Sequence, residues 1–121
     1  MISASTSINT TRAAGDVLGD LQQWANHNNL KATRVAPNQV DIRRGSNAAL
    51  RIKGAIFTKP EQFPVVAAIS ATSNEWATTV HINVLDDLGP AVRTGMKKKM
   101  QTAADSFLTA IVSHLKEFDA S

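Results

Sequence analysis

The sequence predicts an α+β domain, a meander of five or six antiparallel strands in the order β-α-β-β-β-β-β-α, with a long C-terminal helix packed on one face. Three observations carry this prediction. Near both ends of the chain, apolar residues recur every three or four positions, as in amphipathic helices. Between these segments they alternate with polar residues, as in half-buried strands. Short turns rich in Gly, Pro, Asn and Ser separate the alternating stretches, and strands joined by short turns pair antiparallel.

The first elements are a short strand and a helix. Alternation from Ile2 to Ile8 predicts the strand, and Thr10 or the threonine after it is a candidate N-cap for the helix that follows. Gly15 and Gly19 lie four apart in that helix, which predicts a close approach to the sheet. The run at 26–29 predicts its end, because asparagine tolerates the left-handed conformation.

The middle of the chain carries the remaining strands. Their predicted bounds are Lys31–Ala36, Gln39–Arg44, Ala49–Phe57, Val65–Ala71 and Trp76–Leu85. In the last of these strands, we expect Trp76 to share the core-facing side with Val80, Ile82 and Val84. His81 then lies on the opposite face.

The turns also predict a ladder of charged side chains. If Pro37 and Asn38 form the turn between the second and third strands, Arg34 lies opposite Asp41. On the other side, we expect Asp41 to lie opposite Arg51. Such pairs are ordinary surface stabilisation, worth about 0.2–1 kcal/mol each.

The last element is the clearest helix in the sequence, with Thr94 as a candidate N-cap. Its apolar face repeats over roughly six turns. The residues expected on that face are Met96, Met100, Ala103, Ala104, Phe107, Leu108, Ile111, Val112, Leu115 and Phe118.

The element order resembles the helix-grip topology of START and Bet v 1-like proteins, and also the β-α-β4-α arrangement of TATA-binding-protein-like domains. This resemblance spans the whole chain but is one of element order, and the sequence carries no motif of either group. The segment DDLGPAVRTGMKKKM, residues 86–100, is similar to small bacterial proteins with D-x-L-G and then R/K-T-G-M-K-K before a final helix. Helix-grip proteins usually have longer chains, so a filled core is the alternative to a ligand cavity.

Composition bounds the class of protein. The chain of 121 residues is 43% hydrophobic and 19% charged, which is typical of one globular domain over residues 1–121. The absence of cysteine excludes disulfides and thiolate-zinc sites. No apolar run reaches the ~20 residues of a membrane span. The N-terminus does not match a secretory signal, so we expect a cytoplasmic protein.

Motifs for catalysis or cofactors are missing from the sequence. It holds no G-x-S-x-G elbow and no HExxH motif, and the spacing of Gly89 and Gly95 does not fit a phosphate loop. We therefore expect no metal, no cofactor and no catalytic residue.

The sequence favours a non-catalytic binding or accessory protein that holds a small apolar ligand or a protein partner between the sheet and the C-terminal helix. The candidate ligand-binding residues are Trp76, His81, Met96 and Met100. The first alternative to this function is a small cyclase-like or isomerase-like enzyme with His81 in a pocket. A homodimer through an exposed edge strand also remains open.

The other alternative is a binder of anions or of an acidic membrane surface, because cations gather in the middle of the chain and at the start of the last helix. The candidate residues are Arg43, Arg44, Arg51, Lys53, Arg93, Lys97, Lys98 and Lys99. Nucleic acid is disfavoured as the partner, because aromatic residues are not interleaved with these cations.

Overall fold

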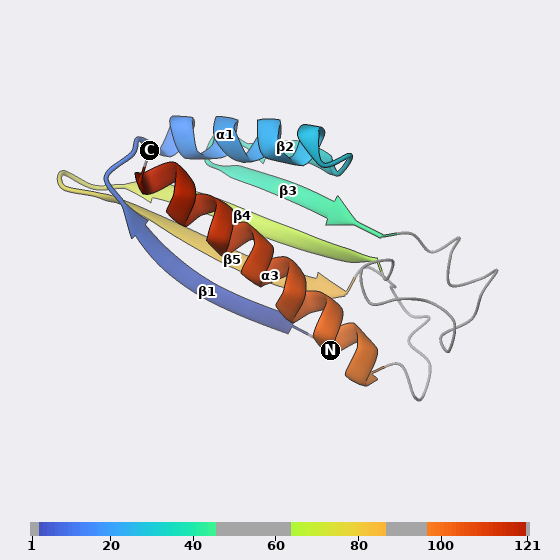
Figure 1. Cartoon of the computed structure of the whole chain (residues 1–121). Helices are drawn as coiled ribbons and strands as arrows, with labels where there is room; N and C mark the ends of the chain where they lie inside the picture. Colours follow the sequence, from blue (N-terminus) through green and yellow to red (C-terminus); the bar gives the residue numbers. More distant parts are fainter. Residues whose placement is uncertain (1–2, 46–63, 87–96, 121) are drawn as a thin grey trace.

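The computed structural model of the chain describes residues 3–45, 64–86 and 97–120, and it confirms the α+β class and the predicted element order (Figure 1). The strands among the described residues form one five-stranded antiparallel sheet with the order β1-β5-β4-β3-β2. The helices and strands described in the chain are β1 (Ser3–Thr10), α1 (Ala14–His27), β2 (Lys31–Ala36), β3 (Gln39–Arg44), β4 (Val65–Ser73), β5 (Thr78–Asp86) and α3 (Lys97–Ala120). The strand predicted at 49–57 lies outside the described residues.

Both described helices lie on the same side of the sheet (Figure 1). Helix α1 packs against β2, β3 and β4, whereas α3 packs against β1, β5 and β4. Strand residues that point to the helices are buried, such as Val65, Ala67, Ile69 and Ala71 of β4. Among the described residues, no helix covers the opposite face of the sheet.

The start and the end of α1 follow different physical rules. The prediction of a threonine cap is wrong, since α1 begins at Ala14 without a side-chain cap. Thr10 instead accepts a hydrogen bond from the Arg12 amide and donates one to the Asp119 carboxylate of α3. The predicted end is confirmed, because Asn29 follows α1 with a φ of 59° in the left-handed region.

The glycines of α1 do not serve a close approach. A Cβ atom added at Gly15 or at Gly19 would meet nothing within 4 Å, so the expectation that they bring α1 nearer to the sheet is wrong. The contact between α1 and the sheet comes instead from the buried residues Val17, Leu18 and Leu21.

The pairing of β2 with β3 contains a bulge that the turn residues did not reveal. Pro37 and Asn38 form the predicted turn, but the register shifts between Arg34 and Ala36. As a result Asp41 lies opposite Thr33, and Arg34 turns to the helix side. There it donates to the side chain of Gln22 in α1 at 3.0 Å and 3.3 Å.

Both charged pairs predicted around Asp41 are therefore wrong. Arg34 pairs with Val40 instead of Asp41. On the other side β3 pairs with β4, which places Ala68 opposite Asp41 in the position expected for Arg51.

The apolar face of α3 agrees with the prediction. Phe107 and Ile111 are buried, as are Met100 and Leu115, while Leu108 is partly buried against the core. Neither α1 nor α3 combines the length and the hydrophobicity that a membrane-crossing helix needs.

Candidate functional site

The face of the sheet that α1 and α3 leave uncovered is built by long-range strand pairing. Ser7 of β1 lies opposite His81 of β5, which lies opposite Ser70 of β4, and Ser70 lies opposite Gln39 of β3. This row of four side chains crosses four strands. Because successive strand residues alternate between faces, all four point away from the helices.

A second row runs beside the first on the same face. It joins Ser5, Asn83, Ala68 and Asp41 across the same four strands. Serine and alanine are short, so the centre of this face stands lower than a strand surface covered by lysine or glutamate. The sequence therefore makes the middle of this face low and rich in hydrogen-bonding groups.

An open hollow of about 460 Å³ lies over these two rows. Its size is within the roughly 300–1,000 Å³ range of small-molecule sites. The lining residues are Ser5, Thr6, Ser7, Gln39, Ala68, Ser70, His81, Ile82 and Asn83. The register turns the side chains of Thr6 and Ile82 to the helix side, so these two line the hollow with main-chain atoms.

Hydrogen bonds within and between strands hold the polar groups of this face. Ser7 Oγ lies 2.7 Å from Nδ1 of His81, and Gln39 Nε2 donates to Asp41 Oδ1 at 3.4 Å. The hydroxyl of Thr79 donates to Asn9 Oδ1 at 3.0 Å, farther along the same two strands. Apart from the His81 ring, the side chains that line the hollow are not ionisable.

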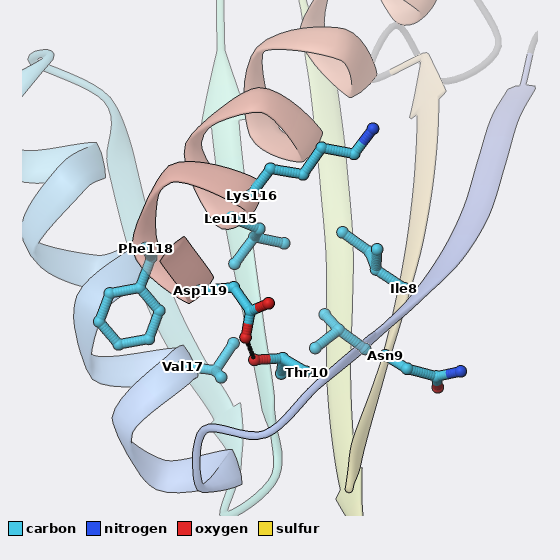
Figure 2. A pocket seen from close by; sticks show the side chains of 9 residues that line it. Ile8, Asn9, Thr10, Val17, Leu115, Lys116, Phe118 and Asp119 are labelled. Carbon is cyan, nitrogen blue, oxygen red and sulfur yellow. Dashed lines mark hydrogen bonds between the residues drawn. The ribbon is translucent and has the colours of Figure 1, made fainter. Parts of the chain in front are cut away.

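A second hollow lies on the helix side, between the end of β1 and the last turns of α3 (Figure 2). Ile8, Val17 and Leu115 form its apolar wall, and the Thr10–Asp119 hydrogen bond closes one side. Its volume is about 40 Å³, which is room for no more than a few water molecules. It is too small to hold an apolar ligand between the sheet and α3.

The three predicted ligand-binding residues that the structure describes, Trp76, His81 and Met100, do not form one site. Trp76 is 86% exposed in the turn before β5, so the expectation that it faces the core is wrong. Asn74 forms this turn by accepting hydrogen bonds from the amides of Trp76 and Ala77, both at 2.8 Å. Met100 is buried in the core, His81 is exposed on the uncovered face, and Met96 lies outside the described residues.

Arg43 and Arg44, the two predicted anion-binding residues described on β3, are also separated. Arg43 points to the uncovered face, opposite Lys31, whereas Arg44 points to α3. Arg44 Nη2 donates to the Ala103 carbonyl oxygen at 2.9 Å, and its guanidinium lies 4.7 Å from the centre of the Phe107 ring. Arg44 therefore attaches β3 to α3 and does not belong to a basic surface.

Of the remaining members of that set, Lys97, Lys98 and Lys99 lie in the described part of the chain. Lys98 is exposed and Lys99 is partly exposed at the start of α3, whose first described residue is Lys97. Arg51, Lys53 and Arg93 fall in the parts of the chain that the structure does not describe.

Sequence reasoning missed most of the lining of the large hollow. It singled out His81 but not Ser7, Ser70, Asn83 or Gln39. The alternation of serines in β1 was a usable signal for a polar outer face, but nothing local indicates that β1 pairs with β5. In the described ranges, no three His, Cys, Asp or Glu side chains are grouped as a metal site would need.

The uncovered face of the sheet offers hydrogen-bond donors and acceptors at fixed positions around a hollow lined in part by short side chains, which suits recognition of a polar molecule. Comparison with known proteins adds no further assignment. No model of a known protein family matches the chain, and no curated protein is significantly similar to it.

Proposed function

We propose that the protein is a non-catalytic binding protein that holds a small uncharged ligand, rich in hydroxyl or amide groups, on the uncovered face of its sheet. The observation that carries this proposal is the hollow of about 460 Å³ over the row of Ser7, His81, Ser70 and Gln39. His81 at the centre of this row is the expected polar anchor.

The chemistry of the lining supports an uncharged ligand. Serine hydroxyls, the Asn83 and Gln39 amides and the His81 ring can each donate or accept a hydrogen bond. A charged ligand would lose hydration in the hollow and would find no opposite formal charge among the lining side chains. Asp41 beside the hollow already accepts a hydrogen bond from Gln39, and its charge would repel an anion.

The other expected sites receive less support from the described residues. Core side chains of the described residues pack between the sheet and α3, and the hollow of Figure 2 in this space is small. The expected basic surface is divided, because Arg44 contacts α3 while Arg43 lies on the opposite face.

The test is ligand-observed NMR with the full chain at millimolar ligand. The probes are glucose, myo-inositol and a neutral dipeptide amide, with glucuronate and glucosamine as charged analogues of glucose. We expect at least one neutral probe to bind, and glucuronate to bind less than glucose. If no neutral probe binds, or if glucuronate binds best, the proposal is wrong.

Paired variants locate the site. Replacing His81 by leucine removes one hydrogen bond to the ligand, which corresponds to roughly a two- to twelvefold loss of affinity at about 0.5–1.5 kcal/mol. Thr33→Val is the control, since Thr33 is exposed on the same face but does not line the hollow. Equal affinities of the two variants would place the site elsewhere.

The contact between Ser7 and His81 favours a second candidate function, which is acyl transfer. Ser7 Oγ lies 2.7 Å from a ring nitrogen of His81, within reach for a base that activates a nucleophile. The discriminating assay is hydrolysis of p-nitrophenyl acetate by the wild-type chain and by Ser7→Ala. A Ser7-dependent burst of p-nitrophenol would favour the enzyme, and equal rates would leave the binding function.

A further inference from the structure

The two edges of the sheet are protected to very different degrees. Edge strand β2 carries Lys31 and Arg34, contains a bulge, and is followed by Pro37. Charges, bulges and prolines are the features that keep edge strands from pairing with other chains. Edge strand β1, with the sequence SASTSINT, has none of them, and it pairs with β5 along its whole length without a register shift.

We propose that β1 pairs with β1 of a second copy of this chain, antiparallel about a two-fold axis at Thr6, so that two sheets join into one. In this register Thr6 meets its own counterpart, and Ala4 lies opposite Ile8 of the second copy. Ser5 lies opposite Ser7 of the second copy on the other face. Every helix-facing residue thus meets a helix-facing residue, which strand pairing requires.

The position of α3 suits this arrangement. Helix α3 packs over β1, β5 and β4, and neighbouring strands are about 4.8 Å apart. A helix axis above β5, the middle one of these three strands, lies about 7 Å from the two-fold axis, which puts the two α3 axes about 14 Å apart. Closely packed helices are separated by about 8–10 Å, so α3 and its copy would meet through their side chains and not by close backbone packing.

The side of α3 that faces the β1 edge is suited to such a contact. Gln101 donates to the Ser3 carbonyl oxygen at 3.2 Å, and Asp119 accepts from Thr10, so this row of α3 lies along β1. Leu108 and Val112 belong to the same row, which follows the three- and four-residue spacing of a helix face. Both are only partly buried.

Charges on this row are complementary under the same two-fold axis. Gln101 of α3 lies beside Ser3 and Asp119 lies beside Thr10. Counting in proportion between these two contacts, Thr6 lies beside residues 108 and 109 of α3. Reversal about this level leaves Asp105 of one copy offset from Lys116 of the second copy by only about one helical turn, ~5.4 Å, along the helix axis. Both residues are exposed in the single chain. The pairing therefore brings opposite charges together on both sides of the axis.

The second copy would also extend the uncovered face. Ser5 and Ser7 form the border of the large hollow at the β1 edge. Pairing places Ser7 and Ser5 of the second copy directly beside them. The dimer inference rests on the edge and on α3, and it holds whatever molecule occupies the hollow.

The test uses the full chain and two matched pairs of variants on the two edge strands. Thr6→Lys places two lysines against each other at the proposed axis, whereas Thr33→Lys adds the same charge to β2. Both threonines are exposed, so circular dichroism should report an unchanged fold. Light scattering across a concentration series should give a dimer for the wild type and for Thr33→Lys, and a monomer for Thr6→Lys.

A single cysteine reports the axis directly, because the wild-type chain contains no cysteine. Under mild oxidation Thr6→Cys should form a covalent dimer much faster than Thr33→Cys, since residue 6 faces its own copy. The proposal is wrong if the wild type is a monomer or if Thr6→Lys remains a dimer. It is also wrong if the two cysteine variants cross-link equally. A monomer that binds a synthetic SASTSINT peptide would also overturn it, because the edge would then be free for another chain.

Discussion

Replacing Arg44 by alanine should destabilise the fold, although the sequence placed this residue in an anion-binding surface. Its Nη2 donates to the Ala103 carbonyl oxygen at 2.9 Å and to Ser106 Oγ at 3.3 Å. Its guanidinium also lies 4.7 Å from the centre of the buried Phe107 ring. Arg44→Ala therefore removes contacts that join β3 to α3.

The magnitude follows from these contacts. A hydrogen bond from a charged donor contributes about 1.5–3 kcal/mol, and a cation–π contact contributes on the order of 1 kcal/mol. We expect the free energy of unfolding to fall by about 2–4 kcal/mol, the lower part of the range reflecting partial exposure of Arg44. At about 4 °C per kcal/mol for a domain of this size, Tm should fall by roughly 8–16 °C.

The assay is urea unfolding followed by circular dichroism, with Arg43→Ala as the matched control. Arg43 is exposed and lies on the opposite face, where a surface charge interaction contributes about 0–1 kcal/mol, so its replacement should lower the free energy of unfolding by no more than about 1 kcal/mol. If Arg44→Ala unfolds at the same urea concentration as Arg43→Ala, Arg44 does not attach β3 to α3. The assignment of Arg44 to the contact with α3, which separates it from Arg43, would then be wrong.

Other variants test separate parts of the fold by the same unfolding assay. Replacing Gly15 and Gly19 of α1 by alanine should stabilise the protein by up to about 1 kcal/mol each, because a Cβ atom meets nothing at either position. A loss of stability would mean that α1 packs closer to its neighbours than the structure shows. His114→Ala should cost about 1–2 kcal/mol, since its Nε2 lies 2.6 Å from Asp20 of α1 and its ring stacks on a tryptophan. No loss would show that this bridge does not join α1 to α3. Trp76→Ser should leave the unfolding midpoint unchanged, because this side chain is 86% exposed, and a large loss would indicate a buried position.

Periodic patterns predicted the elements because each pattern reflects local geometry. The apolar spacing of the last helix correctly identified Met100, Phe107 and Ile111 as core residues. The end of α1 was predictable from its asparagines, since the left-handed conformation of Asn29 depends on that residue alone.

Features that depend on one extra residue or on distant pairing were not predictable in this way. The bulge in β2 leaves composition and alternation almost unchanged, yet it moves Arg34 from the solvent face to α1. Trp76 continues the alternation of β5 backwards, but the hydrogen bonds of Asn74 place it in a turn.

The candidate site depends on strand order, which the sequence pattern does not contain. Ser7 and His81 are far apart in the chain and meet because β1 pairs with β5 at the edge of the sheet. Ser70 and Gln39 join them only through the further pairing of β4 and β3. Local patterns therefore identified His81 as a polar strand residue without showing that it lies in a hollow.

The role of the uncovered sheet face is decided most directly by an NMR titration of isotope-labelled protein with the best neutral probe, followed through backbone amide shifts. Binding in the large hollow should shift the amides of β1, β4 and β5 around Ser7, Ser70 and His81, and His81→Leu should weaken the response. Amides near Met100 and Phe107 in the core should remain unchanged. Shifts centred on α3, with none around His81, would contradict a ligand site on this face.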